Sequence, residues 1–348
     1  VVNIRKDATE HQRKEVMRYL QLVAPHKDQA DPRFIRFRNG VLDIETLELL
    51  PADAEHIVLN EIPHDWNPEA RSELVDTTFN AIAQGDPAII ANLWEMFGLS
   101  MYRGHEVSRM ILLQGSGANG KSTLLDVLKY VLGDDNCFSL SIHELGEKFQ
   151  LVPTMGKLAI IGDDISNDAV NARSCAIMKK FVTGEAVSDQ YKGGVTFQFS
   201  PYATLIYSCN EIPKFADATH GFERRVHPIP LTARFSPGDE GYDPRLKAKL
   251  CTEECAEYAV LKAVEALRGC LDRLTLTPNR LSDEMRNDIL QENDCVVGFV
   301  KEMKRAAYDF VGKAVSDVYG KFTKWCEGAG IEPLSQGTFS RRLCNHEG

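Results

Sequence analysis

The chain passes from Met110-Ile111-Leu112-Leu113-Gln114 directly into Gly115-Ser116-Gly117-Ala118-Asn119-Gly120-Lys121-Ser122. The first stretch is a short apolar run, typical of a buried strand. The second satisfies G-x-x-x-x-G-K-[ST], and the amphipathic pattern from Thr123 to Leu132 predicts a helix that ends at Gly133. This order of strand, glycine-rich loop and helix predicts a phosphate-binding loop in an α/β fold. A glycine-rich turn that matches by chance is the alternative, and both flanking elements argue against it.

The residue types of this loop suit a nucleoside triphosphate and a metal ion. Glycines let successive backbone N–H groups turn towards phosphate oxygens at the N-terminus of a helix. Lys121 can reach the β- and γ-phosphates, and the Ser122 hydroxyl can ligate Mg²⁺. We therefore expect ATP and Mg²⁺ to be bound. The expected nucleotide-binding residues are Gly115, Ser116, Gly117, Ala118, Asn119, Gly120, Lys121, Ser122 and Thr123.

Polar side chains follow two further apolar runs, as expected where parallel strands end at a ligand site. Asp163 and Asp164 follow the run Lys157–Gly162, and Asn210 follows Tyr202–Cys209. We expect Asp163 to support Mg²⁺ through water and Asp164 to orient or deprotonate the attacking water. Asn210 could contact the γ-phosphate or that water. The alternative for the acidic pair is a solvated turn.

Two adjacent arginines, Arg224 and Arg225, stand just ahead of another apolar segment. Such an arginine can complete the site of a neighbouring subunit as a finger. A surface pair in local salt bridges is the alternative. Arg225 is favoured as the finger because it directly precedes the predicted strand, but the choice between the two stays open.

Composition and charge narrow the class of protein. A chain of 348 residues with 43% hydrophobic and 26% charged residues is typical of a globular protein with two or three domains. No apolar run is long enough to cross a bilayer, so we expect a cytoplasmic protein without a membrane partner. The nine cysteines lack paired CxxC elements, which favours reduced thiols. The net charge of −10 argues against a surface coated in nucleic acid but allows DNA in a locally basic channel.

The rest of the chain predicts further elements. Strand and helix patterns alternate from Ser108 to about Phe235, which indicates an α/β layer with a mainly parallel sheet. Asn39-Gly40 between apolar runs signals a hairpin. Pro278 marks a boundary before a small mixed module, in which residues 301–348 hold eight Lys/Arg against six Asp/Glu. Helices are predicted from about Asp7 to Val23, Glu73 to Met101 and Pro244 to Leu274.

The motifs, in this order, resemble those of superfamily 3 helicases of the phage and plasmid primase–helicase family, which is related to poxvirus primase–helicases. The Asn-Gly-Lys-Ser-Thr end of the loop and Asn-Glu-Ile-Pro after the third strand are quite specific to that family. Ile35–Ile44 resembles the segment ahead of the ATPase, and Tyr319–Phe339 resembles a C-terminal winged-helix module. The motifs are GSGANGKST from Gly115, LAIIGDDI from Leu158, YATLIYSCNEIP from Tyr202 and FERRV from Phe222.

The resemblance implies an AAA+-like hexamer that encircles DNA, translocates 3′-to-5′ and grips one strand with a hairpin. Gly184–Phe199 is interpreted as such a hairpin, with a tight turn at Gly193-Gly194. Lys192 at its tip matches the family's DNA-contacting lysine, and an ordinary solvated lysine is the alternative. In one departure from the pattern, Asp163-Asp164 replaces the Asp-Glu of many relatives, which puts the role of Asp164 in doubt.

We therefore expect four segments: an N-terminal, mostly helical module (1–95), an AAA+ core (96–235), a helical extension (236–295) and a winged-helix-like module (296–348). The expected function is an ATP-dependent replicative helicase acting as a ring on single-stranded and forked DNA. A primase or polymerase module is expected ahead of Val1 in a longer polypeptide. Two alternatives stay open: a P-loop ATPase that loads or remodels other proteins, and an origin-binding module that uses ATP only as a structural ligand.

Overall fold

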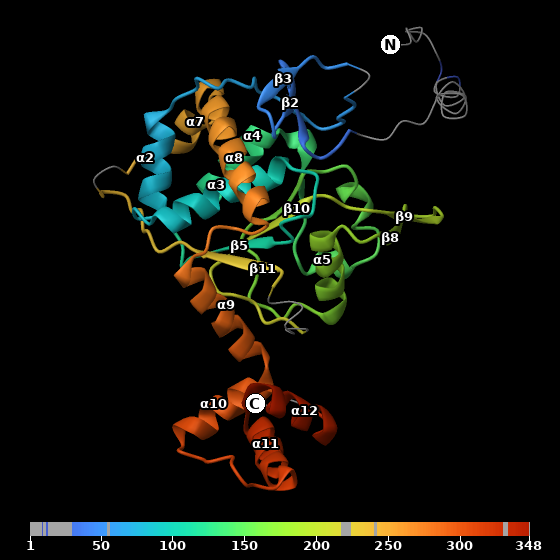
Figure 1. Cartoon of the computed structure of the whole chain (residues 1–348), viewed down its shortest axis with the longest axis vertical. Coiled ribbons are helices and arrows are strands. Elements are labelled where there is room, and N and C mark those ends of the chain that lie inside the picture. The colour runs from blue at the N-terminus through green and yellow to red at the C-terminus, as the bar shows by residue number, and fades with distance from the viewer. Residues whose placement is uncertain are drawn as a thin grey trace.

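The computed structural model describes residues 30–53, 56–216, 224–239, 242–329 and 333–347, together with Thr9 and Gln12. Apart from those two residues, the predicted helix from Asp7 to Val23 lies outside the described part. Figure 1 shows a body built around a parallel sheet, from which helix α9 (Arg280–Asn293) leads to a separate group of three helices. None of the helices in the described ranges is both long and apolar enough to cross a membrane.

The centre of the body is a sheet in the order β11-β5-β10-β7-β6, and every neighbouring pair runs parallel. The predicted, mainly parallel sheet is therefore confirmed. Both of its faces are buried, which explains why its strands read as nearly unbroken apolar runs. The strands are β5 (Met110–Gln114), β6 (Cys137–Ser139), β7 (Ala159–Gly162), β10 (Thr204–Cys209) and β11 (Val226–Pro230).

Alternate residues of each strand face two different hydrophobic cores. In β5, Ile111 and Leu113 pack on one side of the sheet, and Met110 and Leu112 pack on the other. The helix α5 (Ala172–Thr183) contributes to the second core. The first core is covered by α2 (Glu73–Ile82), α3 (Pro87–Met101), α4 (Lys121–Leu132) and α8 (Glu253–Arg273), with the short α7 (Leu246–Leu250) beside α4. The predicted helical stretches 73–101 and 244–274 are confirmed as helical, but each is divided into two helices.

The segment ahead of these helices corrects one prediction. Residues 34–62 form a four-stranded sheet ahead of helices α2 and α3, so the described part of the expected mostly helical module (1–95) is a mixture of strands and helices. Its strands have only two to four residues, too few to show an alternating pattern in sequence. The predicted hairpin is confirmed, but Phe37 pairs with Gly40, so its two-residue turn is Arg38-Asn39 and not Asn39-Gly40. The strands are β1 (Phe34–Phe37), β2 (Gly40–Asp43), β3 (Glu48–Leu50) and β4 (Glu61–Ile62).

The C-terminal group consists of α10 (Cys295–Arg305), α11 (Val315–Ala329) and α12 (Gln336–Glu347). It has a hydrophobic core of its own, in which the rings of Phe299, Phe322 and Phe339 contact one another. Residues 295–329 and 333–347 contain no strand, so the expected mixed module is wrong for these residues. The strands that a winged helix would add are likewise not found there. We call this group the three-helix module.

A two-stranded hairpin formed by β8 (Val187–Gln190) and β9 (Thr196–Phe199) projects from the body (Figure 1). The predicted hairpin is confirmed, but its turn differs from the prediction. Gln190 pairs with Thr196, so five residues, 191–195, form the loop in place of a tight Gly-Gly turn. The carboxylate of Asp189 anchors the base of the hairpin by accepting hydrogen bonds from the backbone N–H groups of Phe149, Leu151 and Val152 at 2.8–3.1 Å.

Candidate functional site

The glycine-rich loop has the conformation that a phosphate cradle requires. Gly117 has a φ of 100°, and Gly120 precedes the first turn of α4 with a φ of 85°. A Cβ atom at Gly117 would meet nothing within 4 Å, so this part of the loop borders open space. A Cβ atom at Gly120 would lie 2.8 Å from the Ile82 side chain, so glycine is required there for packing as well as for its backbone angle. The helix begins at Lys121, two residues earlier than its pattern predicted.

Lys121 is buried although it carries a charge, with 8% of its surface exposed. Its Nζ donates to the carbonyl oxygen of Gly115 at 2.5 Å and to Oδ1 of Asn210 at 3.2 Å. Burial lowers the pKa of the Lys121 ammonium, and the nearby carboxylates of Asp164 and Asp163 act in the opposite direction. The lysine is therefore held across the loop, beside the end of β10, where it can meet an anionic ligand.

Ser208 holds the acidic pair in place from the neighbouring strand. Its hydroxyl donates to Oδ1 of Asp163 at 2.6 Å and accepts the backbone N–H of Asp164 at 2.9 Å. The side-chain amide of Asn210 donates to Oδ1 of Asp164 at 3.1 Å. Together with the contact between Lys121 and Asn210, these bonds link three strand ends. Ser208 was not predicted as a site residue, although a serine within an otherwise apolar buried strand was a usable signal.

The register of the sheet explains why these residues meet. Cys209 at the end of β10 pairs with Gln114 at the end of β5, and Tyr207 pairs with Gly162 at the end of β7. The loop, the acidic pair and Asn210 therefore follow at one edge of the sheet, where ligands of parallel sheets collect. The structure thus brings together Lys121, Asp163, Asp164 and Asn210, as predicted, while their roles stay predictions.

The oxygen atoms at this edge fit a magnesium ion. Ser122 and Asp163 are exposed there and offer a hydroxyl and a carboxylate. Mg²⁺ typically takes one or two carboxylates, keeps several waters and shares substrate phosphates. It therefore needs no cage of protein ligands, and no cluster of three or more His, Cys, Asp or Glu side chains suited to a metal occurs in the described ranges.

A hollow next to the loop was not predicted. It has a volume of about 530 Å³ and is bounded by α2 on one side and by the segment around Phe235 and Tyr242 on the other. Ala118, Gly120 and Thr123 of the loop and of the start of α4 also line it. The backbone N–H of Phe235 donates to the carbonyl oxygen of Ala118 at 2.8 Å, which holds the segment around Phe235 against the loop. A hollow of this size with apolar walls can hold a planar base. Its lining residues are too far apart in the chain for a sequence pattern.

Arg224 and Arg225 lie at the opposite edge of the sheet. Val226 pairs with Met110 at the start of β5, and the backbone N–H of Met110 donates to the carbonyl oxygen of Arg225 at 2.7 Å. A strand as long as β5 spans about 16 Å, more than an arginine side chain extends. Neither arginine can therefore reach the loop of its own chain. Arg224 is exposed and Arg225 half-buried, and Phe222 and Glu223 of the same motif lie outside the described residues.

Lys192 is exposed in the loop at the tip of the β8–β9 hairpin, which projects from the body (Figure 1). Beside it, the ring of Tyr191 stacks on that of Phe197, with centroids 5.8 Å apart, and Tyr191 is still 60% exposed. Phe199 continues this row on the same face, since residues two apart in a strand share a face. The tip therefore offers a cation and an aromatic ring together. Only the cation was predicted from the sequence.

Two known families match the chain in tandem. Residues 2–84 match the family described as "D5 N terminal like", and residues 113–225 match DUF5906, described as a family of unknown function. The apo structure of the C-terminal region of NrS-1 is similar with a TM-score of 0.52 and 14% identity, over 81% of this chain and 66% of that one. At this identity the likeness concerns the fold alone.

Curated viral proteins are also similar. "Putative helicase L207/L206" of Acanthamoeba polyphaga mimivirus is 28% identical over 241 residues, 59% of this chain and 23% of that protein. "Putative primase C962R" of African swine fever virus is 34% identical over 123 residues, 33% of this chain and 12% of that protein. "Putative helicase 121R" of Invertebrate iridescent virus 3 is 24% identical over 268 residues, 69% of this chain and 27% of that protein. The chain thus spans about a quarter or less of the length of these relatives. Taken together, the two family matches and these similarities show that it belongs to the viral and phage primase–helicase family.

Proposed function

We propose that the chain is the Mg·ATP-hydrolysing motor of a replicative DNA helicase with an AAA+ core. The observation that carries the proposal is the line of hydrogen bonds from Lys121 through Asn210 to Asp164, with Ser208 fixing Asp163. It joins a phosphate-binding loop, a metal-binding acid and a polar amide at one sheet edge. Phosphoryl transfer needs these groups for positioning and charge stabilisation.

Each residue has a defined task in this proposal. The backbone N–H groups of Gly115–Gly120 and the Lys121 ammonium hold the β- and γ-phosphates, and the hollow beside Phe235 takes the base. Ser122 and Asp163 hold Mg²⁺, which neutralises charge on the phosphates when bound. Asp164 accepts a proton from the attacking water or orients it, and Asn210 fixes that water and the γ-phosphate. The carboxylates of Asp164 and Asp163 favour the charged form of Lys121 and partly offset the lowering of its pKa by burial.

The arginines support a ring. Because Arg224 and Arg225 lie at the sheet edge opposite the loop, either of them would act on the nucleotide of an adjacent chain. An arginine supplied in trans increases phosphoryl-transfer rates by about 10³–10⁵-fold. Head-to-tail contacts of this kind form a closed ring when the rotation between subunits closes, and we propose a hexameric ring.

Single-stranded and forked DNA are the proposed substrates. Family membership supports this, as does the hairpin tip with Lys192 and Tyr191, since cations with stacked aromatic rings are how proteins hold single strands. Six tips in a ring would line its pore. The proposal has four further parts, which are translocation in the 3′-to-5′ direction, a primase or polymerase module in the full polypeptide, a phage, plasmid or mobile-element origin, and action in the host cytoplasm.

One set of measurements tests it: ATP hydrolysis with and without single-stranded DNA, unwinding of a forked duplex, and mass in solution. We expect DNA-stimulated hydrolysis, unwinding and a mass of several chains. Hydrolysis without stimulation or unwinding would indicate the loader or remodeller. Sequence-specific duplex binding with negligible turnover would indicate the origin-binding module.

A further inference from the structure

Helix α10 turns one face towards the core of the three-helix module and another away from it. Val296 and Phe299 are buried in that core. The outward face carries three cations in the second half of the helix, at spacings of three and four residues that place them side by side. These outward residues are Val297, Lys301, Lys304 and Arg305.

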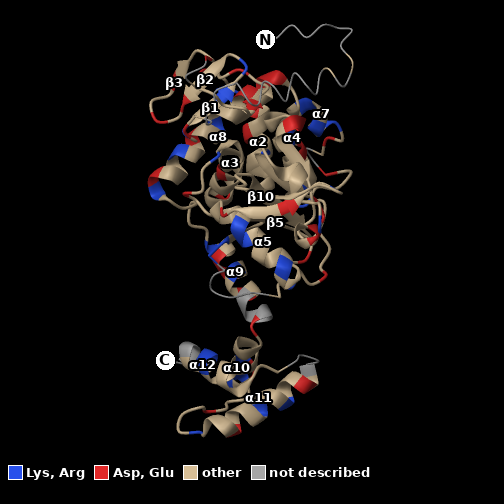
Figure 2. Ribbon diagram, turned by 90° about the vertical axis from the view of Figure 1, so that its right-hand side faces the viewer, with Lys and Arg blue, Asp and Glu red and all other residues tan. Residues whose placement is uncertain are grey.

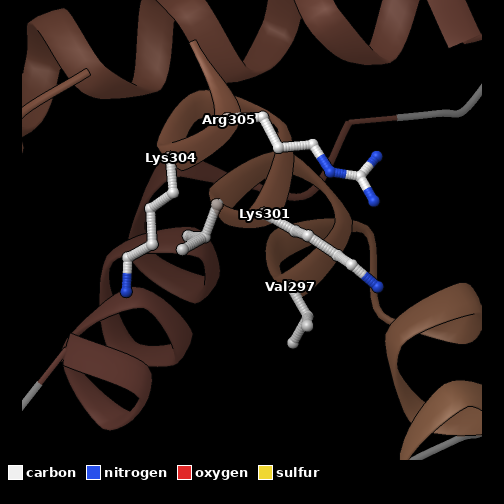
Figure 3. Close-up of a pocket in the computed structure, with 5 residues that line it drawn as sticks. Val297, Lys301, Lys304 and Arg305 are labelled. Carbon is white, nitrogen blue, oxygen red and sulfur yellow. The ribbon is translucent and has the colours of Figure 1, made fainter. Parts of the chain in front are cut away.

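The outward face borders an open hollow of about 510 Å³, which Val300 also lines. Figure 3 shows the ends of Lys301 and Arg305 on one side and that of Lys304 on the other, so the cationic groups diverge. None of the described residues that line the hollow is acidic. Glu302 on the same helix accepts a hydrogen bond from Nε1 of Trp325 at 2.5 Å, so its carboxylate is directed towards α11.

Two simpler explanations do not account for this face. Lys304 and Arg305 lie in the last turn of α10, where cations stabilise the helix dipole, but Lys301 lies before that turn. A compact ligand would need an enclosed hollow with polar groups that converge on it. Cations spread over an open, shallow surface suit an extended polyanion instead.

We propose that this face of α10 binds the phosphate backbone of duplex DNA. The chain has a net charge of −10, yet residues 301–348 carry eight Lys/Arg against six Asp/Glu, and Figure 2 shows Lys and Arg on all three helices of the module. Duplex DNA presents one negative charge per about 1.7 Å of its axis, so several diverging cations can meet phosphates at once. Single strands are held with the help of exposed aromatic rings, and no aromatic residue lines the hollow among its described residues.

Contacts of this kind position DNA without reading its bases. The three-helix module lies at the end of α9, and the β8–β9 hairpin projects from the body (Figure 1). The module would hold duplex while the hairpins hold the single strand. This assignment of duplex to the module and of the single strand to the hairpins rests on the proposed function. Duplex binding by α10 does not itself require that the chain hydrolyses ATP.

The test is the binding of a blunt, fluorescently labelled duplex, measured by anisotropy over a series of salt concentrations. The variant carries Lys301→Gln, Lys304→Gln and Arg305→Gln in the full chain. We expect weaker binding and a plot of log K against log salt that is shallower by up to about 3, because each lost phosphate contact removes about 0.9 from the slope. Lys313→Gln, Lys324→Gln and Arg341→Gln together form the matched control, since these three are exposed elsewhere in the module. The control should change the slope by less than about 1.

Single replacements guard against a folding defect, since Lys301→Gln or Arg305→Gln alone should each change the slope by about 1 at an unaltered unfolding temperature. An equal loss in the control triple, or unchanged duplex binding by the α10 triple, overturns the proposal. The proposal is also overturned if the parent chain binds single strands but no duplex. That outcome would not contradict the proposed motor. Duplex binding that depends on α10 in a chain without DNA-stimulated hydrolysis would overturn the motor and retain the α10 site.

Discussion

The hydroxyl of Ser208 on β10 donates a 2.6 Å hydrogen bond to the carboxylate of Asp163 at the end of β7. Because Asp163 is the proposed magnesium ligand, Ser208→Ala should leave nucleotide binding intact and raise the Mg²⁺ concentration needed for half-maximal hydrolysis. Residues that orient a metal ligand contribute about 10–100-fold in affinity or activity. Magnesium titrations of ATP hydrolysis measure the effect. Ser100→Ala is the control, since Ser100 is equally buried but bonds to the carbonyl oxygen of Met96 in α3.

Lys121→Ala should abolish ATP hydrolysis without unfolding the chain, because the γ-phosphate loses its nearest cation. Steady-state phosphate release is the measurement, with circular dichroism as the check on folding. Lys129→Ala, on the same helix but in its last turn, should hydrolyse ATP at close to the parent rate. Hydrolysis by Lys121→Ala at near the parent rate would mean that this loop is not the catalytic site.

Arg225→Ala should bind nucleotide yet fail to stimulate hydrolysis in its neighbour, with a loss of about 10³–10⁵-fold if it is a true finger. Mixing Arg225→Ala with Lys121→Ala chains should restore some activity, since mixed interfaces pair an intact loop with an intact finger. Arg224→Ala should give the milder defect. Mixtures that demonstrably co-assemble and still show no recovery would exclude action in trans.

Lys192→Ala should retain basal hydrolysis, bind single-stranded DNA with a weaker salt dependence, and lose unwinding. The reason is that, in the proposed ring, a lysine from each subunit would meet backbone phosphates in the pore. Tyr191→Ala should weaken single-strand binding by about 1–3 kcal/mol, the contribution of stacking one base on an aromatic ring. Lys324→Ala is the control for a change in net charge. A Lys192→Ala ring that unwinds normally would remove this lysine from the mechanism.

Acid should destabilise the fold through His227. Burial, with Arg109 and Arg286 facing it, lowers the pKa of this imidazole to about 3. The unfolded chain binds a proton near pH 6.5 and the folded chain does not, so the free energy of unfolding falls as the pH drops below that value. The slope is up to about 1.4 kcal/mol per pH unit.

Denaturant unfolding between pH 7 and 5 of the parent and of His227→Phe tests this. The free energy of unfolding of the variant should depend less steeply on pH than that of the parent, whatever its absolute value. The comparison isolates His227 from His105, whose pKa burial also lowers. Identical slopes would show that His227 takes up a proton in the folded chain.

Prediction from the sequence was most accurate for the strands with clear apolar runs and for the polar residues that directly follow them. The run Met110–Gln114 became β5 with those bounds, and Lys121, Asp164 and Asn210 meet as expected. Parallel strands place their carboxyl ends together, so residues far apart in sequence could be grouped in advance.

Other features depend on contacts that no pattern carries. The sheet β1–β4 is made of strands too short for a period, and the hollow beside Phe235 joins α2 to a loop more than 150 residues away along the chain. The pairing of Val226 with Met110, which sets Arg225 beside the start of β5, was likewise not predictable from the sequence. Five residues in the hairpin loop, rather than two, were equally invisible, since Gly193-Gly194 suits either turn.

The anchoring of the hairpin by Asp189 has a mechanical consequence. Its carboxylate is bound to backbone N–H groups of residues 149–152, in the segment that leads into β7 and so to Asp163. A force applied at the hairpin tip would therefore be transmitted to the strand end that carries Asp163, the proposed magnesium ligand. Coupling of this kind is reciprocal. If bound nucleotide changes the position of the hairpin, then tension on the hairpin must in turn change the affinity for nucleotide. Such a motor would slow under an opposing load, and the strand on which it pulls would regulate its consumption of ATP.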